Sequence, residues 1–455
     1  MRIGVRGRTS ITALVVGLCG LSMVIGYLNK ARCAVAPFDE LGRSTIFDKI
    51  KDTQVCYSDI QLLWLGRDID LHVFPYVSGG ITADGTLSGG TVEYPVLSGL
   101  LMWLGGIGSH TDAEFLLHSA LILAPFGLLT AWMLGRLAGW WALLWSATPP
   151  LILYAFHNWE LPVVATGVAA IFVMTLERIP FRTRAVIAAV LLAIGFCLKL
   201  YPGAFVLPLL VLAYVLARDH RESGRYDVRG AVGVASAAIG TVVAVNLPFA
   251  LISYEGWRAS FTFQQNRLAD ITTNSIWYWG LRPLFDPAAA STPAPAFDQT
   301  VGILSPLLVC AAFALALKMG WPRLQRDGAV GWIAVSAAML CGFLLLHKVH
   351  SPQYTLWLIP FFVLLRVPWG LVAAYLVSDL AIGIGVFKYF GALAVGTDAQ
   401  TYEMLVKFGV WGRAALLVVL FFVFLRASLR RPALPDGATP IDGERAPIMA
   451  PEPAR

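Results

Sequence analysis

Long apolar stretches recur along the whole chain and are separated by short polar turns. A helix that crosses a bilayer needs roughly 20 mostly apolar residues. The pattern predicts about twelve crossing helices, and they are approximately 11–29, 114–135, 138–156, 161–176, 185–199, 201–217, 230–252, 301–317, 329–346, 353–365, 369–387 and 408–425. The apolar stretch 95–108 is too short for an easy crossing, so we expect a helix that lies on the membrane surface.

Three polar regions interrupt this pattern. The first loop, about 30–113, is the longest polar stretch, and a second loop covers about 253–300. The tail 432–455 is rich in proline and alanine, which is typical of a disordered extension. We therefore expect one integral membrane domain, 1–431, followed by a disordered cytoplasmic tail.

The composition agrees with a membrane protein and excludes other classes. Hydrophobic residues make up 57% of the chain and charged residues 14%, and mean hydropathy is +0.69. Soluble domains carry about 25% charged residues, so a soluble globule and a disordered chain are both excluded. Six cysteines in 455 residues are too few for a disulfide-stapled secreted domain. The sequence predicts an all-α polytopic membrane protein.

Positive charge predicts the orientation of the helices. The short loops 177–184, 218–229 and 318–328 are rich in Lys and Arg, as is the stretch after the last helix, and cytoplasmic loops carry this excess. The net charge of +6 therefore does not indicate nucleic-acid binding. The first helix exceeds the roughly 7–15 apolar residues of a signal peptide, so we expect a retained anchor. We predict a multi-pass plasma-membrane protein with both termini in the cytoplasm and both long loops outside.

Two cysteines, Cys33 and Cys56, fall in the first outer loop, where the environment permits disulfides. A bridge between them would tether Tyr57, Ser58 and Asp59 to the end of the first helix. The alternative is a pair of free thiols. The other four cysteines lie within apolar segments, where cysteine usually serves as a small buried side chain.

The outer loop is rich in carboxylates, with nine of the chain's 28 between residues 30 and 94. Asp59 is the candidate general base, because such a base is a carboxylate held against the hydroxyl proton that it removes. Glu93 and Tyr94 either contact a sugar or acceptor, or mark the start of an interfacial helix. Asp68-Ile69-Asp70 spells the metal-binding DxD pattern, but this spacing is common by chance, and we expect no metal.

Cations at the outer membrane face are candidates for holding a leaving phosphate. They are Lys199, the cluster His347, Lys348 and His350, and three arginines of the second loop, Arg258, Arg267 and Arg282. A lone lysine at a helix end is also often an anchor whose charge reaches the interface. This alternative stays open for Lys199.

Several polar or aromatic residues complete the candidate site. Asn158 and Glu160 either line a cavity or cap a helix, and Ser351, Gln353 and Tyr354 either bind substrate or begin a helix. Asn266, Asn274, Trp277 and Trp279 either contact a sugar or belong to the interfacial aromatic belt. Asp379 and Arg413 lie inside apolar segments, where charge is costly. We interpret them as a structural pair distant from the site.

Five motifs in order resemble the GT-C class of membrane glycosyltransferases, and specifically glycosyltransferase family 87. They are YSDIQLLW, EYPVLSG, HNWELPVVATG, KLYPGAFVLPLLVL and HKVHSPQYTLWLIP, and they extend from about residue 55 to 365. Members of this family are actinobacterial mannosyltransferases that use polyprenyl-phosphate mannose. The resemblance implies a GT-C-like bundle with a large first outer loop.

The resemblance also implies a chemistry. Asp59 corresponds to the family's catalytic base, and the sugar, with mannose expected, transfers from a polyprenyl phosphate with inversion. Lys199, Lys348 and the nearby histidines would hold the leaving phosphate, with Tyr201 among the substrate-binding residues. The implied partners are the donor lipid, a glycolipid or lipoglycan acceptor and membrane lipids, with no cofactor. A transporter or flippase for a lipid-linked saccharide, and a non-catalytic scaffold, are the alternatives.

Overall fold

Helices form nearly all of the regular structure in the computed structural model, which describes residues 5–215, 226–285 and 294–430. Eight of the described helices are long and apolar enough to cross a membrane. They are α1 (Val5–Ala31), α5 (Asp112–Ala138), α9 (Phe181–Leu198), α11 (Val228–Ile252), α14 (Pro295–Asp327), α15 (Ala329–Leu346), α17 (Trp369–Val395) and α18 (Gln400–Arg426). The protein is thus an all-α polytopic membrane protein. The predicted tail 432–455 lies outside the described residues.

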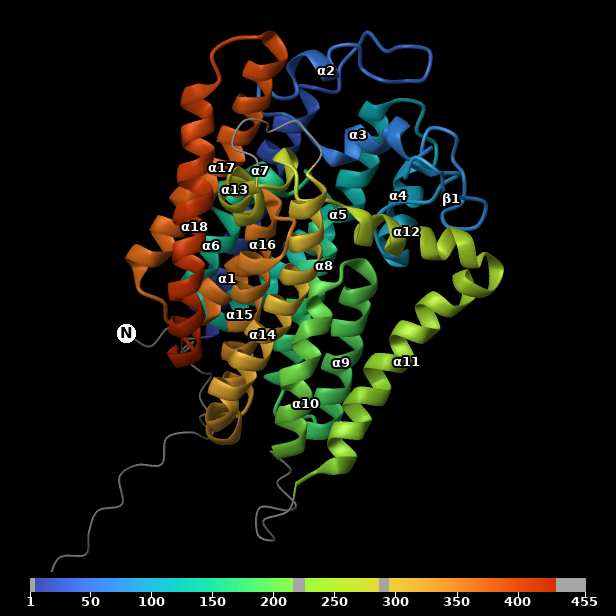
Figure 1. Ribbon diagram of the computed structural model, residues 1–455. Coiled ribbons are helices and arrows are strands. Elements are labelled where there is room, and N and C mark those ends of the chain that lie inside the picture. The colour runs from blue at the N-terminus through green and yellow to red at the C-terminus, as the bar shows by residue number, and fades with distance from the viewer. Residues whose placement is uncertain (1–4, 216–225, 286–293, 431–455) are drawn as a thin grey trace, which may run out of the picture.

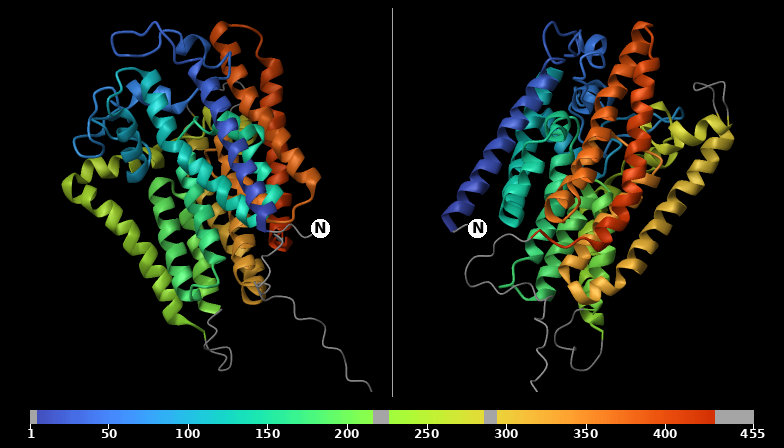
Figure 2. Two further views of the ribbon diagram at one scale, coloured as in Figure 1. Left: turned by 180° about the vertical axis from the view of Figure 1, so that it is seen from behind. Right: turned by 90° about the vertical axis from the view of Figure 1, so that its left-hand side faces the viewer.

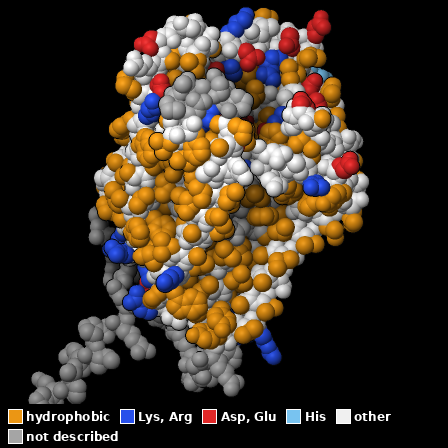
Figure 3. All heavy atoms as spheres, viewed as in Figure 1, with side chains coloured by type: hydrophobic (Ala, Val, Ile, Leu, Met, Phe, Trp, Pro, Cys, Tyr) orange, Lys and Arg blue, Asp and Glu red, His pale blue; other side chains and the backbone are white. Residues whose placement is uncertain are grey.

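The surface of the bundle agrees with this assignment. Apolar side chains cover the middle of the face seen in Figure 3. Acidic side chains gather at one end beside several basic ones, and further basic side chains lie toward the opposite end. Many leucines, isoleucines and valines of α11 and α14 are exposed, including Leu247, Leu251, Ile303 and Leu307. Exposed apolar residues in such numbers are expected where lipid, and not water, surrounds the helices.

Four other apolar helical segments are shorter. They are α4 (Val96–Gly106), α8 (Glu160–Met174), η2 (Tyr201–Phe205) with α10 (Val206–Val215), and η6 (Pro352–Tyr354) with α16 (Thr355–Leu364). A 15-residue helix is only about 22 Å long, less than the roughly 30 Å of a hydrocarbon core. The α4 helix falls within the segment predicted to lie on the surface. The other three begin inside the bundle, so Glu160, Tyr201 and Gln353 at their starts are buried.

The predicted crossing helix 138–156 is not one helix. Gly139, with φ +60, ends α5 and starts a short 3-10 turn, η1 (Gly139–Ala142). Two short helices follow, α6 (Leu143–Ser146) and α7 (Pro149–Tyr154). Pro149 and Pro150 lack the amide protons that a continuous helix would need. Because the helix is interrupted here, the turn 155–159 that follows α7 lies buried inside the bundle.

The long polar loops fold over the charged end of the bundle (Figure 1). The first contains α2 (Phe47–Ile50), α3 (Asp59–Gly66), the two-stranded hairpin β1 (Gly80–Ile81) and β2 (Leu87–Ser88), and α4. The second contains α12 (Tyr254–Asn266), the turn η4 (Ile271–Thr273), the π-helix η5 (Trp277–Leu281) and α13 (Arg282–Phe285). Both are therefore largely folded, and they surround one end of the bundle from two sides.

The centre of the bundle is formed by α15 and α16. Every residue of α16 is buried, and α15 packs between α14 and α18. By contrast, α11 buries only Gly230, Val234 and Ala238 and leans away from the other helices in Figures 1 and 2. The central helices α15 and α16 are thus closely packed, whereas α11 buries few of its side chains at one side of the bundle.

Candidate functional site

A cavity of about 990 Å³ lies where the short helical segments end. Its walls come from the first loop, the turn 155–159, the start of η2, α12 with the loop after it, the turn 347–354 and the outer part of α17. Twelve predicted site residues line it: Asp59, Glu93, Tyr94, Asn158, Lys199, Tyr201, Arg267, Asn274, His347, Ser351, Gln353 and Tyr354. Residues separated by up to about 300 positions in the sequence therefore share one cavity.

The backbone fixes the position of Asp59, the first residue of α3. The Ser58 side chain caps the helix by accepting a hydrogen bond from the Ile60 amide and donates one to Phe156 O, at 2.7 Å. The Asp59 amide donates to His157 O, at 2.8 Å. A carboxylate at the start of a helix also interacts favourably with the helix dipole. Asp59 is thereby attached to the 155–159 turn.

Two side chains orient the Asp59 carboxylate. The Tyr57 hydroxyl donates to Oδ1 and the Asn158 amide donates to Oδ2, both at 2.7 Å. Burial, followed by the charge of Asp59, raises the pKa of Tyr57 well above its usual value, so Tyr57 stays a neutral donor. The Asn158 amide also lies 2.6 Å from the Tyr94 hydroxyl oxygen. Asp59 is half-buried and still faces the cavity.

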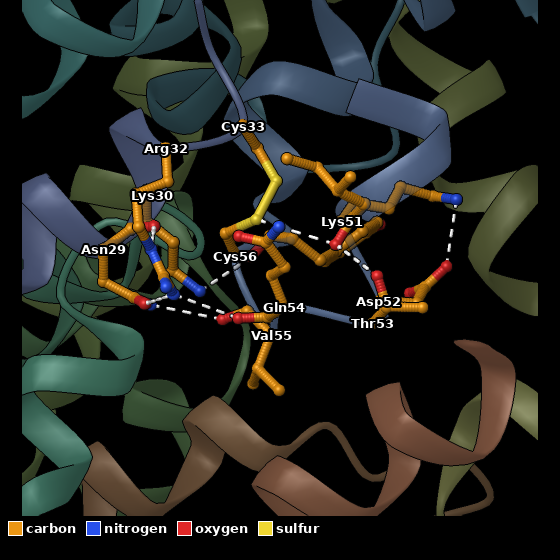
Figure 4. Close-up of a disulfide and its surroundings, with 12 residues drawn as sticks. Asn29, Lys30, Arg32, Cys33, Lys51, Asp52, Thr53, Gln54, Val55 and Cys56 are labelled. Carbon is orange, nitrogen blue, oxygen red and sulfur yellow. Dashed lines mark hydrogen bonds and ion pairs between the residues drawn. A yellow bond between two sulfur atoms is a disulfide. The ribbon is translucent and has the colours of Figure 1, made fainter. Parts of the chain in front are cut away.

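The structure joins Cys33 and Cys56 in a disulfide, as the sequence predicts (Figure 4). The bridge ties the segment 51–56 to the end of α1, directly before Tyr57. The buried Lys30 ammonium donates to Tyr57 O at 2.7 Å and lies 3.5 Å from His157 Nδ1. Burial, and then the charge of Lys30, lowers the pKa of His157 well below its usual value. The Cys33–Cys56 disulfide, Lys30 and the neutral His157 thus hold the segment that carries Asp59.

Lys199 provides a cation in an aromatic enclosure. Its ammonium lies 4.9 Å from the ring centre of Tyr354, 5.3 Å from that of Trp357 and 5.4 Å from that of Tyr94. The fully buried Glu160 accepts from Lys199 through Oε1 and from Trp357 Nε1 through Oε2, the latter at 2.6 Å. Burial opposes the charge, but the charge and hydrogen bond of Glu160 together with Tyr354 and Asp59 outweigh it, and the pKa of Lys199 is raised.

These contacts separate the alternatives left open for Lys199 and Glu160. Lys199 lines the cavity and is ion-paired, so it does not reach out to the interface as an anchor. Glu160 neither lines the cavity nor caps α8. Its carboxylate instead accepts hydrogen bonds from Lys199 and Trp357. The Trp357 ring lies between Tyr201 and Tyr354, with ring centres 4.1 and 3.9 Å away. This stack fixes the wall below the ammonium.

His347 lies at the end of α15 and lines the cavity beside Phe343, whose ring stacks on the imidazole. Burial lowers its pKa from 6.5 to about 4. Its Nδ1 lies 2.8 Å from Val349 O and 3.2 Å from the Val349 amide nitrogen, so it donates to the first or accepts from the second according to the tautomer of the ring. His347 is therefore uncharged at neutral pH until an anion raises its pKa.

Unpaired polar atoms gather next to the cavity, around the loop 273–274. Asn274 Oδ1, Gln353 Oε1, both ring nitrogens of His350, and Nε and Nη1 of Arg413 are buried and have no hydrogen-bond partner among the described residues. His350 and Arg413 are attached to this loop, through His350 N to Thr273 O at 2.7 Å and Arg413 Nη2 to Asn274 O at 3.0 Å. Buried polar atoms are nearly always satisfied, so this region is suited to a polar ligand or to water.

The predicted pair of Asp379 and Arg413 is not a direct ion pair among the described residues, although the two charges interact electrostatically. Asp379 instead accepts from the Tyr154 hydroxyl, at 3.1 Å, and from the Thr355 hydroxyl. No ion pair joins the two residues in the described parts of α17 and α18. Arg413 is also not remote from the site, because it contacts Asn274, which lines the cavity. The sequence could not show this, since 139 positions separate the two residues.

Several predicted residues besides Glu160 lie outside the main cavity. His350 is buried behind it, and Trp277 is buried with Nε1 bonded to Leu346 O at 2.8 Å. Arg282 is buried against the ring of Phe297. Lys348 lines a second, smaller cavity. Ser351 lines the main cavity, whereas Asn266 lines the smaller one.

Several residues of the site were not expected from the sequence. Arg67 forms an ion pair with Glu93 at 2.6 Å, and its guanidinium lies over the ring of Phe263. Gln264 donates to Glu93 O at 2.7 Å. The only sequence signal for Arg67 was its charge in the carboxylate-rich loop. Tyr57 and Trp357 belong to two of the five motifs, but the sequence gave no reason to assign either a role in the site.

Metal-binding residues do not gather in the part of the chain that the structure describes, where no group of three or more His, Cys, Asp and Glu side chains is suitably placed. Asp68, from the DxD-like pattern, accepts from the Gly89 amide at 2.7 Å and so supports the loop. In comparisons with known proteins, no protein-family model and no curated protein matches the chain.

Proposed function

We propose that the protein is a membrane glycosyltransferase that transfers a sugar from a polyprenyl-phosphate donor to a cell-envelope glycolipid or glycan acceptor. One observation carries the proposal: a carboxylate oriented by two donors, Asp59, shares a large cavity with a partly buried cation, Lys199. Base and phosphate-binding cation are the two groups that inverting transfer from a lipid phosphate needs. Mannose is the sugar that the family resemblance favours.

Asp59 serves as the base in this proposal. The Tyr57 and Asn158 donors leave each carboxylate oxygen with a further lone pair for the acceptor hydroxyl. The hydroxyl oxygen attacks the anomeric carbon while its proton passes to Asp59. The bond from that carbon to the phosphate oxygen breaks on the opposite face, and the polyprenyl phosphate leaves with the electron pair.

Lys199 stabilises the leaving phosphate. Its ammonium uses Glu160 for one interaction and can donate further hydrogen bonds toward the cavity. His347 lies in the same cavity and gains a proton more readily once an anion is bound. Asn274, His350 and Gln353 provide unpaired polar atoms beside them. Charge-assisted hydrogen bonds of this kind do not require a metal.

We infer that the short segments α8, η2 with α10, and η6 with α16, together with the broken apolar stretch from η1 to α7, complete a topology of about twelve passes with both termini in the cytoplasm. In this topology the cavity opens outside the plasma membrane, where the positive-inside rule places the loops that surround it. Helices that end early put the cavity at the depth of the lipid headgroups. A membrane-anchored donor can then reach Lys199 while its apolar chain stays in the bilayer.

Sugar transfer by isolated membranes tests the proposal. Membranes that contain the protein are incubated with polyprenyl-phosphate [¹⁴C]mannose and an extract of envelope lipids, and labelled products are separated by chromatography. We expect a new labelled glycolipid in the presence of the wild-type protein and none with Asp59→Asn. A product of equal yield from both would contradict the assigned base.

A transporter or flippase for a lipid-linked saccharide is the second candidate, because Asp379 and Arg413 are fully buried charges inside α17 and α18. Such charges often mark transport pathways. Sealed vesicles loaded with the fluorescent lipid-linked sugar distinguish the two. Movement of the intact lipid without formation of a glycosylated product favours transport.

A further inference from the structure

Beside the main cavity lies a second one of about 380 Å³, on the other side of the segment 265–268. Its polar walls are Lys348 from the turn after α15, Arg267 from the loop after α12, and Asp298 from the first turns of α14. Arg267 lines both cavities. Two cations and one carboxylate give this small space a net positive charge.

The charge of Lys348 is only partly compensated. Its one hydrogen bond to a described residue goes to Gln265 O, at 2.9 Å, whereas an ammonium can donate three. Asp298 is close enough to interact with Lys348 but forms no ion pair with it within the described residues. Burial, and then the neighbouring Arg267, lowers the pKa of Lys348. A bound anion would relieve the repulsion between the two cations.

The surroundings of the cavity indicate the kind of anion. Val301 and Gly302 of α14 form its wall, and a side chain added at Gly302 would meet open space. Directly after them, α14 exposes Ile303, Leu304 and Leu307, in the apolar face that continues along the helix. A positively charged cavity thus adjoins an exposed apolar face of α14.

We propose that the second cavity binds the phosphate of an anionic phospholipid from the surrounding bilayer. Lys348 and Arg267 hold the phosphate oxygens, and the acyl chains lie along the exposed face of α14. The site does not depend on glycosyl transfer, since Lys348 does not line the main cavity. The lipid would hold the segment 265–268, which forms the wall between the two cavities.

Native mass spectrometry of the purified full-length protein tests the site. The protein is mixed with equal amounts of phosphatidylglycerol and phosphatidylcholine, and the lipids that stay bound are counted. We expect wild-type protein to retain phosphatidylglycerol preferentially, and Lys348→Gln to weaken that preference about five-fold, as loss of one interfacial cation should. Lys407→Gln, at an exposed lysine near the start of α18, serves as the matched control and should behave as wild type.

A second variant acts in the opposite direction. Asp298→Asn removes the carboxylate of the cavity, so phosphatidylglycerol should bind more tightly. Equal retention of both lipids by the wild type, or equal losses in Lys348→Gln and Lys407→Gln, would overturn the proposal. Displacement of the lipid by millimolar inorganic phosphate would show that the site takes free phosphate, and would overturn the lipid assignment.

Discussion

At the scale of single residues, Lys199 and Glu160 form a buried pair whose members have separable roles. Glu160 compensates the Lys199 charge, whereas only Lys199 faces the cavity. Removing one partner of a buried ion pair costs about 3–5 kcal/mol, because the other charge is left unpaired. Stability and donor binding therefore respond differently to the two residues.

Lys199→Met should lower the melting temperature clearly and abolish tight donor binding. In the double variant Lys199→Met with Glu160→Gln, no unpaired charge remains, so most of the stability should return while donor affinity stays at least about ten-fold reduced. Melting curves in detergent and binding of labelled polyprenyl-phosphate mannose provide the two readouts. Recovery of donor binding in the double variant would show that Lys199 only supports the fold.

The partly buried His347 makes stability depend on pH. Its pKa is about 4 in the folded protein and 6.5 in an unfolded chain, so acidification places protons on the unfolded state first. From pH 7 to pH 5 this residue should cost about 2 kcal/mol of stability. Melting temperatures at both pH values check this, and the acid sensitivity should be smaller in His347→Gln. An identical pH dependence in the variant would contradict the assignment.

Much of the candidate site could be predicted residue by residue, because polar residues inside apolar sequence are rare and conspicuous. Lys199 and His347 stand out on this basis, whereas Asp59 is indicated by the carboxylate-rich outer loop and by the family resemblance. The fold brings all three to one cavity. Orientation could not be predicted in the same way. The sequence does not tell that Glu160 points behind Lys199, that Lys348 faces a second cavity, or that Arg413 contacts Asn274 across 139 positions.

At the scale of elements, the disulfide between Cys33 and Cys56 holds the segment that precedes Asp59. Removing a bridge that closes a loop of this size should cost about 3 kcal/mol through the entropy of the unfolded chain. Cys33→Ala with Cys56→Ala should therefore lower the melting temperature and reduce transfer, because Tyr57 loses its support.

The exposed free cysteine Cys310 provides the control for this experiment. Cys310→Ala should leave both the melting temperature and transfer unchanged. If the double variant is as stable and active as the control, the bridge does not position Asp59.

The pattern of apolar residues predicted the long helices well, because length alone identifies a crossing segment. It was wrong for 138–156, where Gly139 and the Pro149-Pro150 pair divide an apolar stretch into short pieces. It also could not locate where α8, η2 with α10, and η6 with α16 begin within the bundle. The cavity lies at the starts of these segments. Hydropathy measures apolarity and not where a helix stops, so these ends required the structure.

At the scale of the whole molecule, the proposed function requires the end of the bundle that contains the cavity to face the outside of the plasma membrane. Single cysteines at Thr397, between α17 and α18, and at Arg178, between α8 and α9, test this in a Cys310→Ala background. A membrane-impermeant maleimide applied to intact cells should label Thr397→Cys only, and Arg178→Cys should react only after permeabilisation. The reverse pattern would place the cavity in the cytoplasm.

The central claim is that Asp59 is the base of a sugar transfer from a lipid phosphate. The most direct test compares Asp59→Asn with Asp52→Asn, a second carboxylate that lines the same cavity but is paired with Lys51. Both variants are purified, and their donor affinity and transfer rate are measured. We predict that Asp59→Asn binds the donor within about two-fold of wild type but transfers at least about 100-fold more slowly, while Asp52→Asn transfers normally. Transfer by Asp59→Asn at the rate of Asp52→Asn would contradict the account.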